Sequence, residues 1–274
     1  MNEREQERQT VRLLVRARED FQDMRKRMDN RIGRKADGDD QDLENADKRV
    51  IAGDDKLMFG GIADAAHEQE AAIEKELKKV LKRFPVYTEF LKGVKGVGPI
   101  AAGWIVGEYD IQRADTVSKL WQFTGLNPGM VPGRKRVEDG EGESHYELTG
   151  VMVRGDKLTP GHVAPFNKRL RTALAGVMCD GFIKAQNEYC MKYYYPMKAR
   201  LEQSDGMVAE ISKAGAKPKD VAWKEAKKAH RHRAAIRYML KMFLRDLYVA
   251  WRTIEGLTVR EPYAAEYLGK KHAA

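Results

Sequence analysis

Apolar residues near the start of the chain recur at alternating spacings of three and four, the period of a helix that packs along one seam. Residues 3–33 and residues 62–84 each carry such a seam between charged flanks. The first seam comprises Leu14, Ala17, Phe21, Met24 and Met28. The second comprises Ile62, Ala66, Ile73, Leu77, Val80 and Phe84. From Gly33 to about Gly53 the chain is polar, acidic and rich in helix breakers, which predicts a loop or linker.

Two such helices joined by a loop predict an antiparallel coiled-coil hairpin over 1–88, or half of a dimeric bundle. The alternative is a pair of amphipathic helices packed on the chain's own core. Polar residues surround a narrow seam, which favours the coiled coil. We therefore expect a homo-oligomer, a dimer in its simplest form, held together through this region.

The rest of the chain, 89–274, also has a mainly helical pattern, so the expected fold class is all-α. Helices are expected around a turn within 91–123 (the last one over Thr116–Phe123), over 166–201 and over 221–253. Residues 129–165 have little helical periodicity. Their short alternating pieces predict either a β-hairpin or a loop inserted into the helical domain.

The segment between Leu91 and Ala102 has the most informative local pattern. It ends one apolar segment, makes a Gly-x-Gly turn at Gly96-Val97-Gly98 and opens a new helix with Pro99 at its first position. Backbone N–H groups at such a turn and helix N-terminus can receive a phosphate, and Lys92 and Lys95 lie beside it. The pattern resembles a helix-hairpin-helix, which grips a nucleic-acid backbone. An ordinary helical hairpin whose glycines only permit close packing is the alternative.

Charge is consistent with a polyanionic partner without proving one. The 274 residues include 50 Lys and Arg against 41 Asp and Glu, a formal net charge of +9. Acidic residues gather in 37–55 and 138–147, so the remaining surface is more basic than the total indicates. Cys179 and Cys190 lie too far apart along one helix to pair, and no metal-binding motif, signal peptide or long apolar run is evident. We therefore expect a cytoplasmic, nucleoid-associated protein with reduced thiols and with no metal, cofactor or membrane partner.

Around the glycine turn the chain resembles the C-terminal domain of the IS-one-ten insertion-sequence transposases, the family of the pilin-gene inverting recombinases. The matching segments keep the family's order, and the two predicted N-terminal helices are similar to the coiled coil that precedes that domain. The segments are Gly93–Pro99, Gly107–Ile111, Lys119–Pro128, Asn167–Leu174, Arg237–Trp251 and Tyr263. The resemblance implies a DNA-binding scaffold from a mobile element.

Two departures from the family bear on chemistry. This chain begins at the coiled coil, without the RuvC-like domain that carries the family's acidic metal-binding tetrad. Where the family keeps a nucleophilic serine before the asparagine, this chain has Gly161–Phe166, which contains no hydroxyl. Thr159 and Ser144 are the nearest substitutes, and serine-type attack on a phosphate needs the hydroxyl held among basic donors. The resemblance therefore implies the scaffold more than the catalysis.

Basic residues outside the turn extend the expected nucleic-acid interface. They form two groups: Arg134, Lys135 and Arg136 after the Pro-Gly turn, and Asn167, Lys168, Arg169 and Arg171 at the start of a helix. Solvated surface is the alternative for both. The acidic run from Glu138 to Glu147 fits no metal-loop signature, and His230 and His232 cannot share one helical face. Aromatic residues in Tyr193–Tyr195 suit a core better than base stacking.

Three functions compete on this pattern. The first is a nucleic-acid-binding protein related to such a transposase, gripping DNA or structured RNA without catalysis by itself. The second is an active transposase or recombinase with a substitute nucleophile or a catalytic domain supplied by a partner. The third is a structural protein that uses the coiled coil alone.

Overall fold

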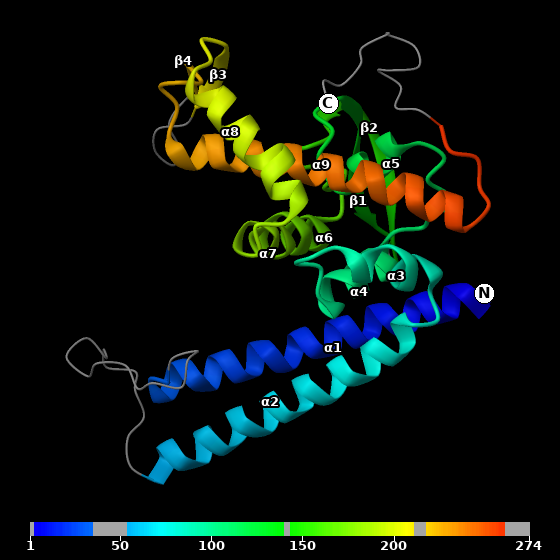
Figure 1. Cartoon of the computed structure of the whole chain (residues 1–274), viewed down its shortest axis with the longest axis vertical. Coiled ribbons are helices and arrows are strands. Elements are labelled where there is room, and N and C mark those ends of the chain that lie inside the picture. The colour runs from blue at the N-terminus through cyan, green and yellow to red at the C-terminus, as the bar shows by residue number, and fades with distance from the viewer. Residues whose placement is uncertain (1–2, 35–53, 140–142, 211–217, 261–274) are drawn as a thin grey trace. The chain divides into compact units, whose positions relative to one another are not determined.

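The computed structural model describes residues 3–34, 54–139, 143–210 and 218–260, and most of them lie in helices, which confirms the expected mainly helical class (Figure 1). The chain divides into two compact units. Unit 1 is Met1–Tyr87 with Ala102–Glu108, and unit 2 is Thr88–Ala101 with Tyr109–Ala274. The expected boundary after residue 88 thus differs in one respect: Ala102–Glu108 belongs with the N-terminal helices. The expected linker falls almost wholly outside the described residues.

Unit 1 is an antiparallel helical hairpin of α1 (Glu3–Ile32) and α2 (Asp54–Leu81) (Figure 1). The second helix starts eight residues before the expected position, because Asp54 and Asp55 provide a favourable acidic first turn. At the other end, α1 stops at Gly33, whose φ of 71° is left-handed, and the Arg34 N–H donates to Asp29 O at 2.9 Å. These caps fix the length of the hairpin.

The buried seam of α1 lies one position away from the expected one, so the prediction for this helix was wrong. Its spacings are still three and four, and its members are Arg8, Val11, Val15, Arg18, Gln22, Arg25, Asp29 and Ile32. Five of these eight residues are polar, which is why a search for apolar periodicity found the neighbouring stripe instead. On α2 the expected Ala66, Leu77 and Val80 are buried, as is Phe84 just after the helix, and Ile73 is half-buried. Ile62 is exposed, and Ala63 takes its place.

The apolar residues that the sequence assigned to the α1 seam lie on one side of the hairpin, together with residues of α2. We call this set the side stripe; each member precedes a seam position by one residue. It comprises Leu14, Ala17, Phe21, Met24, Met28, Met58, Ile62, Ala65 and Ala72. Because the two helices run in opposite directions, positions one residue before the seam fall on the same side of the pair. All nine side chains are half-buried or exposed.

The opposite side of the hairpin is covered within unit 1 by Ala102–Glu108, the C-terminal part of α4 (Pro99–Glu108). The Trp104 Nε1 donates to Glu19 Oε1 at 3.1 Å, and a Cβ on Gly107 would lie 2.9 Å from Arg12 Cγ. Glu19 and Arg12 each follow a seam position by one residue. Small residues on α4 therefore let it approach this side closely, and the side stripe faces away from it.

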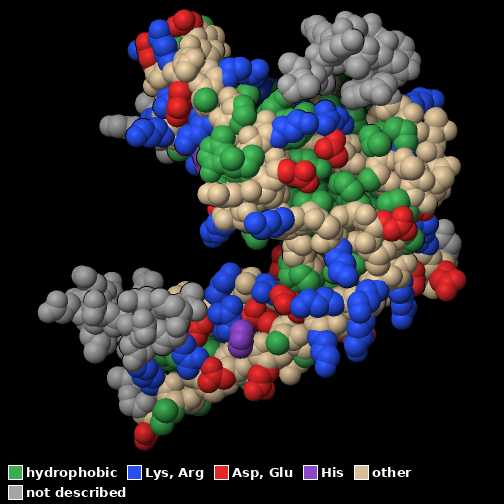
Figure 2. All heavy atoms as spheres, viewed as in Figure 1, with side chains coloured by type: hydrophobic (Ala, Val, Ile, Leu, Met, Phe, Trp, Pro, Cys, Tyr) green, Lys and Arg blue, Asp and Glu red, His purple; other side chains and the backbone are tan. Residues whose placement is uncertain are grey.

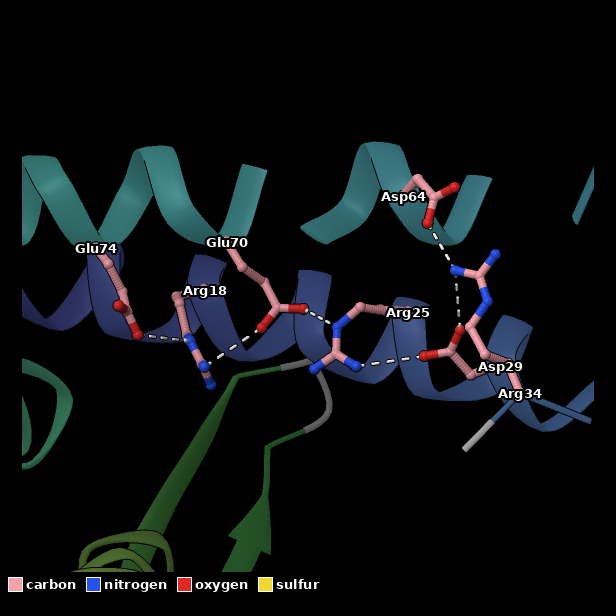
Figure 3. Close-up of polar contacts among 7 residues, drawn as sticks. All are labelled: Arg18, Arg25, Asp29, Arg34, Asp64, Glu70 and Glu74. Atoms are coloured by element: carbon pink, nitrogen blue, oxygen red, sulfur yellow. Dashed lines mark hydrogen bonds and ion pairs between the residues drawn. The ribbon is translucent and has the colours of Figure 1, made fainter. Parts of the chain in front are cut away.

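Ion pairs replace apolar contacts in the middle and distal part of the seam (Figure 3). The Glu70 carboxylate, of which 4% is exposed, bridges Arg25 Nε at 2.6 Å and Arg18 at 3.3 Å. Further pairs extend this network along the hairpin: Arg18–Glu74, Arg25–Asp29, Arg34–Asp29 and Arg34–Asp64. Hydrogen bonding to Glu70 raises the pKa of Arg25, so the guanidinium stays charged. Charges of both signs also lie along the outer surface of the hairpin (Figure 2).

Unit 2 is organised around α9 (Lys228–Ile254), the long C-terminal helix. Its inner face is wholly buried at Leu240, Phe243 and Leu247, and Phe243 meets Phe182 edge-on at 5.3 Å between ring centroids. The Arg252 guanidinium donates to Ile111 O and Ala114 O, at 3.0 and 2.8 Å. These contacts tie α9 to the loop before α5 (Val117–Phe123).

The region expected as one helix over 166–201 is broken into shorter pieces. These are α6 (Lys168–Thr172), the π-helical η2 (Ala173–Met178), α7 (Cys179–Lys184), the π-helical η3 (Cys190–Tyr194) and α8 (Tyr195–Glu202). Gln186, at a φ of 45°, reverses the chain between α7 and η3. Tyr193 and Tyr194 are buried, as expected of core residues, and Cys179 and Cys190 are buried free thiols.

Two small antiparallel sheets complete unit 2. The segment 129–165 contains a β-hairpin, one of the two structures expected for it, formed by β1 (Met130–Glu138) and β2 (Ser144–Arg154). We call this pair the β-ribbon. The second sheet pairs β3 (Met207–Glu210) with β4 (Lys219–Ala222). The expected start of the last helix at 221 was therefore wrong, because Val221 pairs with Val208 in this sheet.

Candidate nucleic-acid interface

The glycine turn links the 3-10 helix η1 (Leu91–Gly93), which follows the short α3 (Pro85–Glu89), to α4, which begins at Pro99 as expected. Leu91 and Val94 are buried and anchor the turn, while Lys92 and Lys95 are exposed. The Val97 N–H donates to Val94 O at 3.0 Å, so this group is already used within the turn. Asn187, itself buried, donates to Lys95 O at 2.8 Å and so fixes the turn from the side of η3.

The two glycines of the turn differ in what they do. Gly96 has a φ of 95°, and a Cβ there would lie 3.0 Å from Phe182 Cδ1 and 3.1 Å from the Gly181 carbonyl. Gly96 therefore serves close packing against α7, which is the alternative that the sequence left open. A Cβ on Gly98 would meet nothing within 4 Å. Gly98 is the position where the backbone of the turn is open to an approaching ligand.

The basic run on β1 is divided between the two faces of the β-ribbon. Arg134 and Arg136 point to one face, and Lys135 points to the other, where it pairs with Glu147 at 3.3 Å. All three side chains are exposed. The run expected as one group of contacts therefore presents two arginines together and keeps its lysine in an internal ion pair.

The second expected group, at the start of α6, is also split. The Asn167 side chain accepts from Leu170 N at 3.0 Å, so it caps the helix. Lys168 and Arg169 are exposed. Arg171 is half-buried: its guanidinium donates to Asp156 O at 2.7 Å and lies 4.9 Å from the centre of the Phe166 ring. Of this group, Arg171 alone is drawn inward.

Arg171 belongs to a cluster of cations that three elements of unit 2 bring together near Asp156. We call it the basic cluster. Its members are Arg154 at the end of β2, Arg171 on α6, and Arg233, Arg237 and Lys241 on α9, with the Asp156 carboxylate among them. Arg154 and Asp156 form a two-bond pair, with 2.9 Å in each bond. Arg154 and Arg171 thus contact Asp156 directly, its charge also acts on Arg237 and Lys241, and Arg233 acts on Arg237.

The electrostatics of the basic cluster show that its positive charges are held close together. Burial lowers the pKa of Arg237, and the neighbouring Arg171, Arg233 and Arg154 lower it further. Burial, with a contribution from Arg237, also lowers the pKa of Lys241. Within the described part of the chain, neither Arg237 nor Lys241 forms an ion pair with a carboxylate. Asp156 opposes these effects on both groups, but one carboxylate does not balance the cations around it. Like charges that are partly desolvated and only partly offset raise the free energy of the empty site, and a bound anion would relieve this.

Packing fixes Lys241 in this position. Its ammonium lies 5.0 Å from the centre of the Trp121 ring, and the Trp121 Nε1 donates to Lys241 O at 3.1 Å. Gln122 on the same helix donates to Gly155 O and Pro165 O, which holds the loop carrying Asp156 against α5. The cluster is therefore built on rigid elements rather than on mobile side chains alone.

Sequence reasoning missed most of the basic cluster. A signal was present in α9, where Arg233, Arg237 and Lys241 recur every four residues and so share one face of a helix. Nothing local in the sequence connects that face with Arg154 or Asp156. Their meeting depends on how β2 and α6 pack on α9.

The two substitute nucleophiles do not lie in such a setting. Ser144 is exposed at the start of β2 opposite Glu138, and Thr159 is half-buried in the following loop. Neither hydroxyl forms a hydrogen bond with a His, Lys or Arg side chain of the described residues. His232 is used by Tyr194, whose hydroxyl lies 2.7 Å from its Nδ1, and His230 lies 3.6 Å from Glu210.

In the described ranges, no helix combines the length and the apolar character that crossing a bilayer requires. Within those same ranges, no three His, Cys, Asp or Glu side chains gather in a way that suits a metal ion. Comparison of the chain with models of known protein families gave no match, and comparison with curated proteins gave none either.

Proposed function

We propose that this protein binds nucleic acid through the phosphate backbone, with the basic cluster as its principal contact. The observation that carries the proposal is that β2, α6 and α9 bring five cations close to one another, with one carboxylate among them that is already paired. Phosphates are the anions that match this pattern, because arginine binds them with two parallel hydrogen bonds and lysine with a point charge. The open backbone of the glycine turn at Gly98 adds a phosphate contact in the same unit.

Binding of this kind releases counterions, so affinity falls steeply as salt rises. We expect duplex DNA of arbitrary sequence to bind the full chain, with log affinity linear in log salt. Replacing Arg237 and Lys241 by glutamine is expected to weaken binding at least tenfold and to reduce the salt slope by roughly two. Fluorescence anisotropy over a salt series measures both quantities, with structured RNA as a parallel probe.

A matched control separates a site from general charge. Lys184 and Lys224 are exposed and paired with Asp180 and Asp205, so Lys184→Gln with Lys224→Gln removes the same formal charge outside the cluster. This control is expected to bind within about twofold of the unaltered chain, since exposed paired lysines contribute little. If both double variants lose affinity equally, or if the unaltered chain binds no nucleic acid, the proposal fails.

The proposed activity is binding without strand transfer by this chain alone. The resemblance to transposases makes cleavage the natural alternative, and Thr159 or Ser144 would be its nucleophile. Incubating the chain with supercoiled DNA and Mg²⁺ is expected to yield no covalent adduct. An adduct mapped to either hydroxyl would establish the recombinase reading instead.

We also propose that the helical hairpin of unit 1 joins two copies of the chain. The side stripe leaves nine half-buried or exposed apolar side chains on one side of the hairpin, while α4 covers the other side. A two-fold pairing of side stripes would bury the same residues from both copies and form a four-helix bundle. A dimer of this kind contains two basic clusters, one in each copy.

A further inference from the structure

The β-ribbon has two faces of different character. On one face Lys135 pairs with Glu147 at 3.3 Å, and His145 lies 3.2 Å from both Glu147 and Asp139. The charges of this face are therefore satisfied within the ribbon. On the other face Arg134 lies opposite Leu148 and Arg136 lies opposite Tyr146. Neither arginine forms an ion pair with a described residue.

This second face, which we call the reading face, exposes its large side chains to solvent. Tyr146 and Leu148 are 62% and 67% exposed, on a strand pair to which no described residue adds a third strand. An isolated two-stranded ribbon is of marginal stability, and exposed apolar side chains on it indicate a surface that a ligand covers. Two arginines alternate on this face with an aromatic ring and an aliphatic side chain, a surface that suits a ligand with both anionic and apolar groups.

The ribbon is braced at its base rather than along its length. The register shifts between Pro132 and Arg134, where Gly133 faces three residues of β2, Thr149 to Val151. His162 packs on Gly133, and its Nε2 lies 3.1 Å from Thr149 Oγ1. The Val163 N–H donates to Arg134 O at 2.7 Å. These contacts hold the base of the ribbon, and the strands from Arg134 to Glu138 extend beyond them. That extension is ~13 Å long, which is close to the rise of four base pairs.

We propose that the reading face enters the major groove of duplex DNA and contacts base edges. This rests on the proposed function and deepens it, because the basic cluster holds phosphates and the ribbon supplies sequence preference. The major groove of B-form DNA admits a two-stranded ribbon, whereas the deep, narrow groove of A-form RNA does not. Arg134 and Arg136 can each donate two hydrogen bonds to a guanine, and Leu148 and Tyr146 suit thymine methyl groups. Glu138, further along the same face, can accept from cytosine.

Selection from a random duplex pool with the full chain tests the proposal. The unaltered chain is expected to enrich a short motif, and Arg136→Gln with Tyr146→Ser is expected to lose that enrichment about tenfold. Affinity of this variant for random duplex is expected to stay within about threefold, because the phosphate contacts remain. Lys135→Gln removes the same formal charge from the other face of the ribbon and is expected to enrich the same motif.

Methylation of guanine N7 provides a second measurement on the enriched duplex, since N7 faces the major groove. The unaltered chain is expected to protect guanine N7 of the motif from methylation. The variant Arg136→Gln with Tyr146→Ser is expected to leave it unprotected. Tyr146→Phe alone, which keeps the ring and Arg136, is expected to retain the preference. Circular dichroism shows whether each variant remains folded. Binding without any enriched motif, or an unchanged motif in the double variant, overturns the reading face and leaves backbone binding intact. Absence of all duplex binding overturns the proposed function itself.

Discussion

The charge of Lys241 is expected to lower the stability of the free protein and to strengthen the binding of DNA. Its ammonium lies over the Trp121 ring, partly buried and close to Arg237, so its pKa is lowered. A lowered pKa in a base means that the charged form is disfavoured in the folded state. The folded protein therefore bears this cost at neutral pH, and stability rises as pH climbs from the lowered pKa toward the ordinary value of about 10.4.

We expect Lys241→Met to raise the melting temperature of the free protein by about 2 °C at pH 7, because the methionine keeps the packing and removes the charge. The same change is expected to weaken binding of duplex DNA several-fold. Above pH 11 the stability difference should vanish, since the lysine is then neutral in both states. Thermal unfolding at the two pH values measures this, and a variant less stable than the unaltered chain at pH 7 would contradict it.

Of the two glycines of the turn, Gly96 is expected to matter for packing and Gly98 for the approach of a ligand. Gly96→Ala is expected to cost about 1–3 kcal/mol of stability, since the left-handed φ and the contact with Gly181 both disfavour a side chain. Gly98→Ala is expected to leave stability within about 0.5 kcal/mol. Because its Cβ meets nothing in the protein, a tenfold loss of DNA affinity in Gly98→Ala would report a phosphate close to the turn. Urea unfolding and anisotropy on both variants make the test, and unchanged affinity in Gly98→Ala would remove the turn from the interface.

At the scale of elements, the helical hairpin depends on a polar seam. Glu70→Ala leaves Arg18 and Arg25 without their shared carboxylate inside the helix pair and is expected to cost about 3 kcal/mol of stability. Asp64 also joins the network through Arg34, but its side chain is 63% exposed, so Asp64→Ala is the matched control. The control is expected to cost less than about 1 kcal/mol. Chemical unfolding measures both variants. If Glu70→Ala and Asp64→Ala lower the free energy of unfolding equally, the burial of Glu70 does not determine its contribution to stability.

At the scale of the whole molecule, the side stripe determines the expected assembly. Multi-angle light scattering at micromolar concentration is expected to give the mass of a dimer. Met24→Lys with Ile62→Lys places charges on both helices of the stripe and is expected to give a monomer with unchanged helix content. Leu13→Lys, at an exposed position outside the stripe, is the control and should remain dimeric. A monomeric unaltered chain would rule the assembly out.

Leu77, which is fully buried inside the hairpin, is unsuitable for this test because its replacement would unfold the helix pair.

Much of the fold follows from local pattern. Alternating spacings of three and four predicted α1 and most of α2, because that period places residues on one face whatever the rest of the chain does. Pro99 and the Gly-x-Gly turn predicted the start of α4. For residues 129–165 the alternating pattern predicted either a β-hairpin or a loop, and the β-ribbon is the first of these. The break at Gln186 and the strand at Val221 were missed, since packing and sheet pairing override helical propensity there.

By itself the sequence determined that the chain is mainly helical, where the glycine turn lies and that cations exceed anions, because each depends on neighbouring residues or on composition. Tertiary structure decided which of two adjacent stripes on α1 faces α2, since Arg25 and Glu70 pair across 45 residues. It also decided that Gly96 packs while Gly98 stays open, and that Arg136 faces away from Lys135 and its ion pair. The basic cluster is the clearest case. Arg154, Arg171 and Lys241 share one small volume only because β2, α6 and α9 pack together, and the repulsion that marks the site exists only at that proximity.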